Sequence, residues 1–204
     1  MKKAVVAAAV YMVIAGAEAE VFALDFRGTL GSYLSGLTSG VYTTEQNGVT
    51  LEITFSAGGT SGTDLFNLTG TGFGINNSES GDDTDALDDN EHMAINFNLA
   101  GTFQSIEFDR LTSAGITSGD QGRLDFSSGS TINFDGDSSN PLTVNEAFTA
   151  SQLITLSQTA GGSGATWGFG LKTITVNVVP EPATFAMLGI GGLAFSVIRR
   201  ASRK

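Results

Sequence analysis

The densest group of chemically capable side chains is an acidic segment, residues 79–91, which carries seven carboxylates in 13 residues. Carboxylates this close together repel one another unless a cation neutralises them, and Ca²⁺ accepts about six to eight oxygen ligands from a flexible loop. The segment therefore predicts either a structural calcium site or a solvated acidic loop between two strands. The candidate calcium ligands are Asp82, Asp83, Asp85, Asp88, Asp89 and Glu91.

Known calcium motifs do not describe this segment. An EF-hand loop starting at Asp83 would place Leu87 where an oxygen ligand belongs and Ala94 at the final ligand position. The glycine-rich nonapeptide repeat of calcium-binding β-helices is also absent. Any calcium would thus bind in an arrangement particular to this loop, and calcium is the one cofactor that the sequence suggests.

Residues for catalysis are scarce. The chain has no cysteine, a single histidine (His92) and no Gly-x-Ser-x-Gly elbow for a serine nucleophile. His92 could act as a base, but a histidine at the start of a strand is the simpler interpretation. Carboxylate pairs for glycoside cleavage stay open, because their separation is a tertiary property. We predict a protein without enzymatic activity.

Aromatic residues offer a second kind of site. Trp167 and Phe169 lie two apart on one predicted strand and so share a face, as do Phe103 and Ser105. On an exposed face such a pair would stack against a sugar ring, and in the interior it would pack the core. We favour core packing and keep a carbohydrate-binding module as the alternative function.

The elements that position these residues are strands. Apolar and polar residues alternate over 49–55, 93–99, 103–108 and 131–134, the period of a half-buried strand. Further strands are expected at 24–30, 65–68, 73–76, 123–127, 153–157 and 167–178, with Gly- and Ser-rich turns between them and no amphipathic helix. The pattern predicts an all-β fold, an antiparallel β-sandwich like a jelly roll.

Length and charge limit the function further. The chain has 204 residues and a net charge of −11, and residues 24–179 hold four Lys and Arg against 18 Asp and Glu. Nucleic-acid binding needs a basic surface, so nucleic acid is excluded as a partner. One domain of this size accounts for the chain between its two terminal segments.

The N-terminus is typical of a secretory signal. Lys2 and Lys3 precede an apolar run over residues 4–16, and small residues follow. Signal peptidase could cut after Ala19 or after Ala23; we favour Ala23, which gives a signal peptide of residues 1–23 with a signal helix. The expected partners are the Sec translocon and signal peptidase.

The C-terminus has three parts in fixed order. Pro180, Glu181 and Pro182 precede an uncharged apolar stretch, residues 183–198, and a basic tail, residues 199–204. The prolines prevent the preceding strand from continuing. The apolar stretch predicts a short transmembrane helix, and the basic tail places that end in the cytoplasm by the positive-inside rule. The β domain of residues 24–179 would then face outward.

These three parts resemble the PEP-CTERM sorting signal of Gram-negative bacteria. Pro180, Glu181 and Pro182 match its tripeptide, and Arg199 and Arg200 match its basic cluster. The resemblance covers residues 179–204. It implies recognition by exosortase, a membrane cysteine protease thought to act as a transpeptidase, in bacteria that make exopolysaccharide or biofilm.

Together these observations predict a non-catalytic protein of the cell surface or extracellular matrix. The chain would be exported, anchored in the inner membrane with its domain outward, and then processed by exosortase. The resemblance makes exopolysaccharide a further partner. The arrangement of residues 71–110 also looks like galactose-binding-like jelly rolls with an embedded calcium, which would fix the loop and take no part in catalysis.

Overall fold

The computed structural model describes residues 18–59, 63–68, 72–76, 87, 91–109, 121–160 and 168–180. One compact unit extends from Ala19 to Pro180. Its elements are β1 (Glu20–Asp25), α1 (Thr29–Leu34), β2 (Ser39–Gln46), β3 (Val49–Gly58), β4 (Asp64–Leu68), β5 (Gly72–Asn76), β6 (His92–Phe97), β7 (Gly101–Asp109), β8 (Gln121–Phe126), β9 (Thr131–Asp135), β10 (Leu142–Phe148), β11 (Leu153–Ala160) and β12 (Gly170–Val178).

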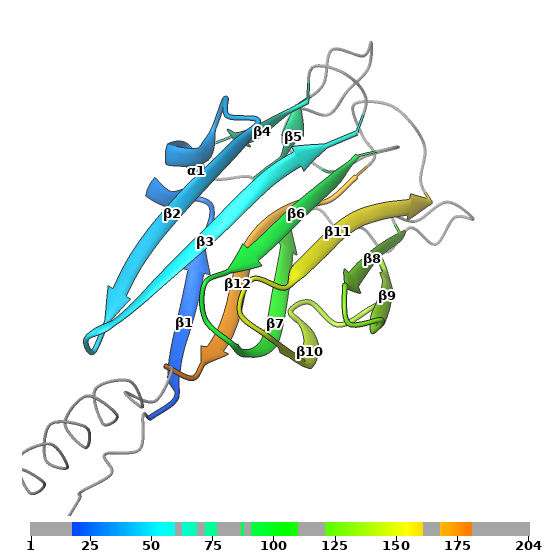
Figure 1. Cartoon of the computed structure of the whole chain (residues 1–204). Coiled ribbons are helices and arrows are strands. Elements are labelled where there is room, and N and C mark those ends of the chain that lie inside the picture. The colour runs from blue at the N-terminus through cyan, green and yellow to red at the C-terminus, as the bar shows by residue number, and fades with distance from the viewer. Residues whose placement is uncertain are drawn as a thin grey trace, which may run out of the picture. The chain divides into compact units, whose positions relative to one another are not determined.

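The strands form two antiparallel sheets (Figure 1). Sheet A has the order β10-β7-β12-β5-β4, and β1 also pairs with β12. Sheet B has the order β2-β3-β6-β11-β8-β9. On one side of β12, β1 pairs along residues 173–178 and β5 pairs at Leu171, whereas β7 pairs along the other side. The last strand of the domain therefore has a neighbour on both sides.

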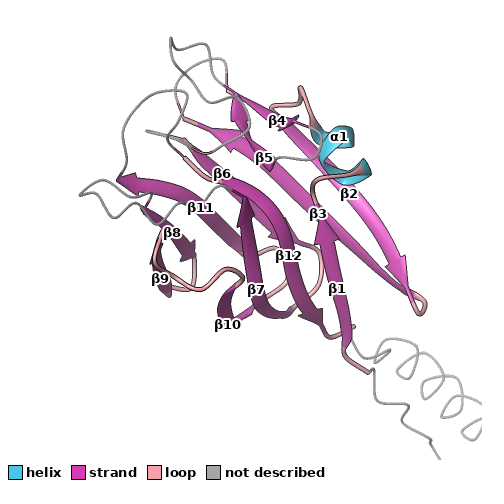
Figure 2. Cartoon of the chain, turned by 180° about the vertical axis from the view of Figure 1, so that it is seen from behind, coloured by secondary structure: helices cyan, strands magenta, loops and turns pink. Residues whose placement is uncertain are grey.

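The two sheets pack face to face over a core rich in phenylalanine (Figure 2). Alternate residues of each strand point inward, as in β3, where Leu51, Ile53 and Phe55 are buried. Phe103 of β7 contacts Phe97 of β6 and Phe126 of β8, so one ring joins the sheets. Such aromatic contacts confirm the predicted β-sandwich.

Two further groups of rings extend this core to other parts of the sandwich. Phe55 of β3 contacts Phe26, and both contact Phe73 of β5. Phe108 of β7 and Phe134 of β9 stack with ring centroids 4.5 Å apart, and both contact Phe169.

Strands β2 and β3 form a hairpin whose turn consists of Asn47 and Gly48. Both residues have positive φ, 50° and 78°, and the flanking Gln46 and Val49 are paired. A two-residue turn with positive φ at both positions suits the twist of an antiparallel pair, and Asn-Gly is its preferred sequence. The turn thereby fixes the register of the longest hairpin in the described part of sheet B.

The structure differs from the sequence prediction in one helix, in two strands and at the start of the domain. The predicted strand 24–30 ends at Asp25, and Thr29–Leu34 form the unpredicted helix α1, whose Leu30 and Leu34 lie one turn apart and are buried. Strands β2 and β10 were not predicted. Strand β1 begins at Glu20, so the predicted boundary after Ala23 falls inside a strand.

Both predicted flanking helices, the signal helix and the transmembrane helix of residues 183–198, lie outside the described residues. Within the described ranges, no helix has the length and apolar character needed to cross a membrane.

Candidate processing site and functional surface

The peptide that follows β12 leaves the sandwich at a fixed point. Val178, the last residue of β12, is fully buried and is paired with Gly101 of β7 on one side and with Glu20 of β1 on the other. The next residue, Val179, is 47% exposed, and its N–H donates to the carbonyl of Ala100 at 3.0 Å. The ladder thus ends immediately before Pro180, which has no N–H to continue it.

Of the predicted sorting residues, the structure describes Pro180. Glu181, Pro182, Arg199 and Arg200 lie outside the described residues. Backbone hydrogen bonds anchor the chain as far as Val179, directly before Pro180.

The acidic segment is described at only two positions. Leu87 forms an isolated backbone bridge with Phe169, with hydrogen bonds of 2.9 and 3.3 Å, and is fully buried. Glu91, directly before β6, is 1% exposed. The other predicted calcium ligands, Asp82, Asp83, Asp85, Asp88 and Asp89, lie outside the described residues. The calcium site stays a prediction, and among described residues no three His, Cys, Asp or Glu side chains form a metal cluster.

The structure also shows the surroundings of His92 and of two aromatic residues that the sequence singles out. His92 is the exposed first residue of β6 and lies against Gly58 of the neighbouring strand. Phe103 and Phe169 are fully buried in the ring contacts described above, which confirms that they pack the core. Trp167 lies outside the described residues. Neither Phe103 nor Phe169 can serve as a sugar-stacking surface.

Comparison with known families settles the C-terminal segment. A family model described as the PEP-CTERM protein-sorting motif matches residues 178–204. The chain carries a PEP-CTERM sorting motif. No curated protein and no solved structure matches the chain.

The match makes exosortase the processing partner, and it implies an exported protein that is anchored in the membrane before cleavage. The PEP-CTERM motif begins at Val178, the final residue of β12, so its first residue belongs to the folded sandwich. Folding of the domain therefore buries the first residue of the motif and leaves the motif accessible to exosortase only from Val179 onward.

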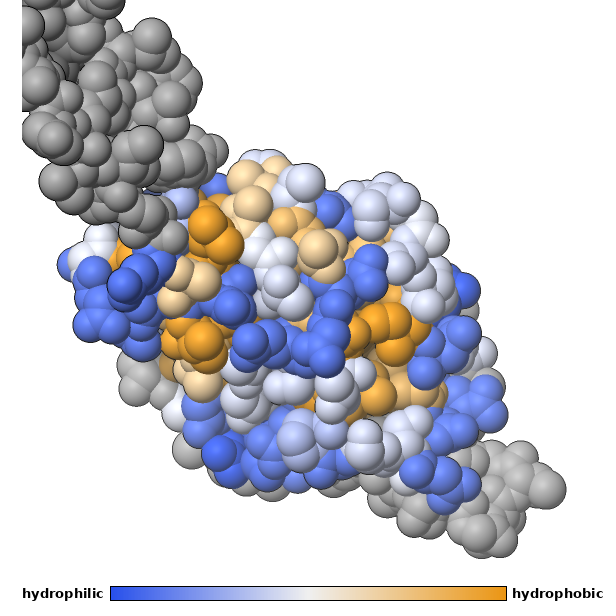
Figure 3. All heavy atoms as spheres, turned by 90° about the horizontal axis from the view of Figure 1, so that it is seen from below, coloured by the Kyte–Doolittle hydropathy of each residue, from blue (hydrophilic) through white to orange (hydrophobic). Residues whose placement is uncertain are grey.

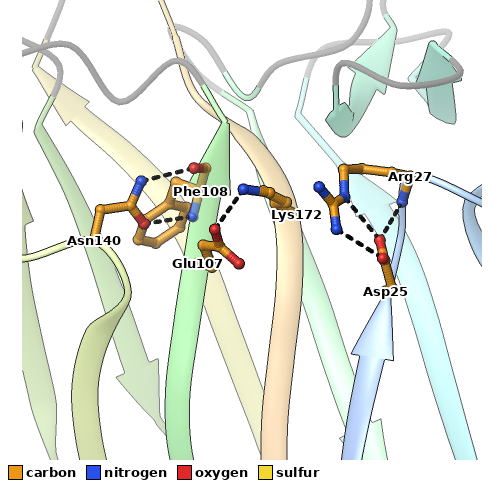
Figure 4. Close-up of polar contacts among 6 residues, drawn as sticks. All are labelled: Asp25, Arg27, Glu107, Phe108, Asn140 and Lys172. Atoms are coloured by element: carbon orange, nitrogen blue, oxygen red, sulfur yellow. Dashed lines mark hydrogen bonds and ion pairs between the residues drawn. The ribbon is translucent and has the colours of Figure 1, made fainter.

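Two ion pairs lie on β12 and on the strands that pair with it, β7 and β1 (Figure 4). Arg27 donates to both carboxylate oxygens of Asp25, at 3.0 and 2.8 Å, and Lys172 of β12 donates to Glu107 of β7 at 2.5 Å. Nearby, the side-chain amide of Asn140 makes two hydrogen bonds with the backbone of Phe108, at 2.9 and 2.8 Å. The amide extends the ladder of β10 by one more pair.

The described cations of the domain are each used in an ion pair. Arg27 pairs with Asp25 and Lys172 with Glu107, while Arg123 pairs with Asp125 at 2.5 Å. Among the described residues, Glu45, Glu52, Asp135 and Asp137 are exposed acids that take no part in these three pairs. Exposed acids of this kind repel polyanions, and salt weakens this repulsion by screening it.

The Asp25–Arg27 pair predicts a pH-dependent stability. The hydrogen bond from the Arg27 side chain is the main cause that holds the pKa of Asp25 below its usual 3.8, and a bond from the Arg27 N–H and the charges of Arg27 and Lys172 lower it further, against the effect of burial. A lowered pKa in the folded state stabilises the fold above about pH 4 and is lost as the pH falls through the folded pKa.

We therefore expect Asp25→Asn to lower the melting temperature slightly at pH 7 and by less at pH 2, where protonation of the wild-type carboxyl weakens its pair with Arg27. The effect is small because both side chains are about half exposed. Thermal melting at both pH values, repeated in about 1 M NaCl to screen the pair, checks this. A loss of equal size at pH 7 and pH 2 would assign the effect to packing.

Proposed function

We propose that the chain is an exported, non-catalytic structural protein of the cell surface or extracellular matrix, delivered by exosortase and associated with exopolysaccharide. The observation that carries this proposal is the PEP-CTERM motif, which continues directly from β12 of an otherwise complete sandwich. The chain passes from the core strand to the sorting peptide with Val179 alone between them.

The described surface supports a structural role. Seen from below, apolar residues are scattered among polar ones (Figure 3). A shallow recess of about 230 Å³, lined by Gln121, Asn133, Asp135 and Ser138 among others, lies on β8 and β9. Its volume is below the roughly 300–1,000 Å³ of ordinary small-molecule sites. This polar part of the described surface suits contact with a hydrated matrix.

We further propose that the sandwich is a jelly roll with an insertion. Strands β1, β12, β7 and β10 follow one another in sheet A, and β6, β11, β8 and β9 follow one another in sheet B. Two four-stranded sheets with the first and last strands side by side, and with the chain crossing repeatedly between the sheets, are the features of a jelly roll. On this interpretation, β2 to β5 and α1 are an insertion between the first two of its eight strands.

The test is to locate the C-terminus of the protein from its native cells. We expect the wild-type chain to end near Pro180–Pro182 and to be recovered with exopolysaccharide or at the cell surface, because exosortase separates the domain from its membrane segment. The double variant Pro180→Ala and Pro182→Ala should instead end at Lys204 in the membrane fraction. Intact-mass and peptide mass spectrometry measure both.

The matched control is Val179→Ala, which changes an exposed side chain next to the tripeptide and should be processed as the wild type is. A wild-type chain that still ends at Lys204 in the membrane fraction would contradict the proposal. A plain membrane-anchored, outward-facing domain would then replace it.

A carbohydrate-binding module is the second candidate, favoured by one surface feature. Tyr33 of α1 is 60% exposed and meets Tyr42 of β2 edge to face, with ring centroids 6.3 Å apart. Exposed tyrosines can stack on sugar rings. In the same fractionation, release of a Tyr33→Ala variant from the exopolysaccharide would support this candidate, and retention would support the structural role.

A further inference from the structure

We propose that signal peptidase cuts between Ala19 and Glu20, so that the exported chain begins at the first residue of β1. The inference rests on the proposed function only in requiring export. It assigns the N-terminal processing site from the register of a strand pair, and it places both processing sites at one end of the sandwich.

The sequence alone permits two cuts. Signal peptidase requires a small side chain directly before the cut and another small, uncharged side chain two positions earlier. Ala17 and Ala19 satisfy this rule for a cut before Glu20, while Val21 and Ala23 satisfy it for a cut before Leu24. The choice between them depends on which residues the folded domain needs.

The pairing of β1 with β12 shows that the domain uses the residues between the two cuts. Glu20 pairs with Val178, and the register continues without interruption to Asp25, opposite Thr173. A cut after Ala23 would remove four of these six residue pairs. The edge of β12 would then be left with unpaired N–H and C=O groups beside the sorting peptide, which is a site for aggregation.

Side chains in the same four residues are also part of the fold. Phe22 is 3% exposed and belongs to the core. The carboxylate of Glu20 accepts hydrogen bonds from the side chains of Gln46 and Asn47, the latter at 2.9 Å, at the β2–β3 turn. A chain starting at Leu24 would have a gap in its core and would lose the contact between β1 and the hairpin.

The residues at the earlier cut have no such role. Glu18 and Ala19 are exposed and precede the first paired residue. Cleavage after Ala19 therefore removes nothing from the sandwich. Ala23, by contrast, lies within β1 and is paired with Thr175. Once β1 has paired with β12, the peptide bond after Ala23 is part of the sheet and is not free to enter the active site of a protease.

A spatial consequence follows from the same register. Glu20 lies opposite Val178, and Pro180 follows Val178 by two residues. The two cleavage positions therefore lie at the same end of the β1–β12 pair (Figure 2). Signal peptidase and exosortase would act on adjacent ends of the same β1–β12 ladder.

The experiment determines the N-terminus of the exported protein by mass spectrometry in three forms: wild type, Ala19→Leu and Ala23→Leu. A bulky residue directly before a cut prevents cleavage there. We expect the wild type and Ala23→Leu to begin at Glu20, and Ala19→Leu to lose this product. Both alanines are exposed, so neither substitution disturbs the core.

A wild-type chain that begins at Leu24 would overturn the inference while export stands. A chain that retains Met1 in every fraction would also overturn the inference, and its recovery from the cytoplasm alone would overturn export and the proposed function with it. As a second measurement, purified domains starting at Glu20 and at Leu24 are melted side by side; the longer domain should melt several degrees higher, and equal melting temperatures would remove the structural basis of the inference.

Discussion

Replacing Phe103 with alanine should lower the free energy of unfolding by about 3–5 kcal/mol. Phe103 is fully buried on β7 of sheet A, and its ring contacts Phe97 and Phe126, which belong to two different strands of sheet B. Truncation would remove apolar area and leave a cavity between rigid strands that cannot close around it. The loss is large because one ring supports both sheets.

Urea unfolding of the domain from Glu20 to Pro180, followed by circular dichroism, measures this loss. Phe103→Leu is the matched control, since it keeps most of the buried volume and should cost clearly less than alanine. At roughly 2–4 °C per kcal/mol for a domain of this size, the alanine variant should melt about 10 °C lower. A loss below about 1 kcal/mol would contradict the idea that this ring joins the sheets.

Gly101→Ala should be the second severe substitution, with a cost of about 1–3 kcal/mol or more from overpacking. A Cβ at Gly101 would lie 2.3 Å from the carbonyl oxygen of Asn177 and 3.0 Å from the Cα of Val178. Both atoms are backbone, and their strand β12 is held by β7 on one side and β1 on the other. The strand cannot move away without breaking its pairs.

Gly58→Ala is the control for this effect. A Cβ there would lie 2.2 Å from Nε2 of His92, a comparably short approach, but the obstacle is the end of an exposed side chain that can rotate away. We expect a loss under about 1 kcal/mol. Equal losses for the two variants, measured by thermal and urea unfolding, would show that backbone contact is not the decisive factor.

Strands with strict alternation could be predicted from sequence because burial on one face imposes a period of two. Strand β10 could not: Asn145 has a φ of 51° and the register with β7 shifts between Thr143 and Glu146, so the period is broken within the strand. Strand β2 lies at an edge of sheet B and is mostly polar, which hides the same signal. Helix α1 is too short for its pair of buried leucines to register as a periodic pattern.

The two processing sites differ in how far sequence can define them. The PEP-CTERM motif is a local string of residues, so Pro180, Glu181 and Pro182 could be predicted directly, and the range of the family match includes them. The start of the domain depends on the pairing of Glu20 with Val178, residues at opposite ends of the chain. No local pattern contains that information, and the rule for small residues fits both candidate cuts.

The position of β12 also determines how the domain responds to mechanical load. If the processed chain is attached through its C-terminus, a pulling force enters at Val178 and acts along the axis of β12. Because β1 and β7 pair with β12 on its two sides, their hydrogen bonds resist this force in parallel and in shear. They must rupture together instead of one after another, so the same strand that carries the sorting peptide would make a firm anchor under flow.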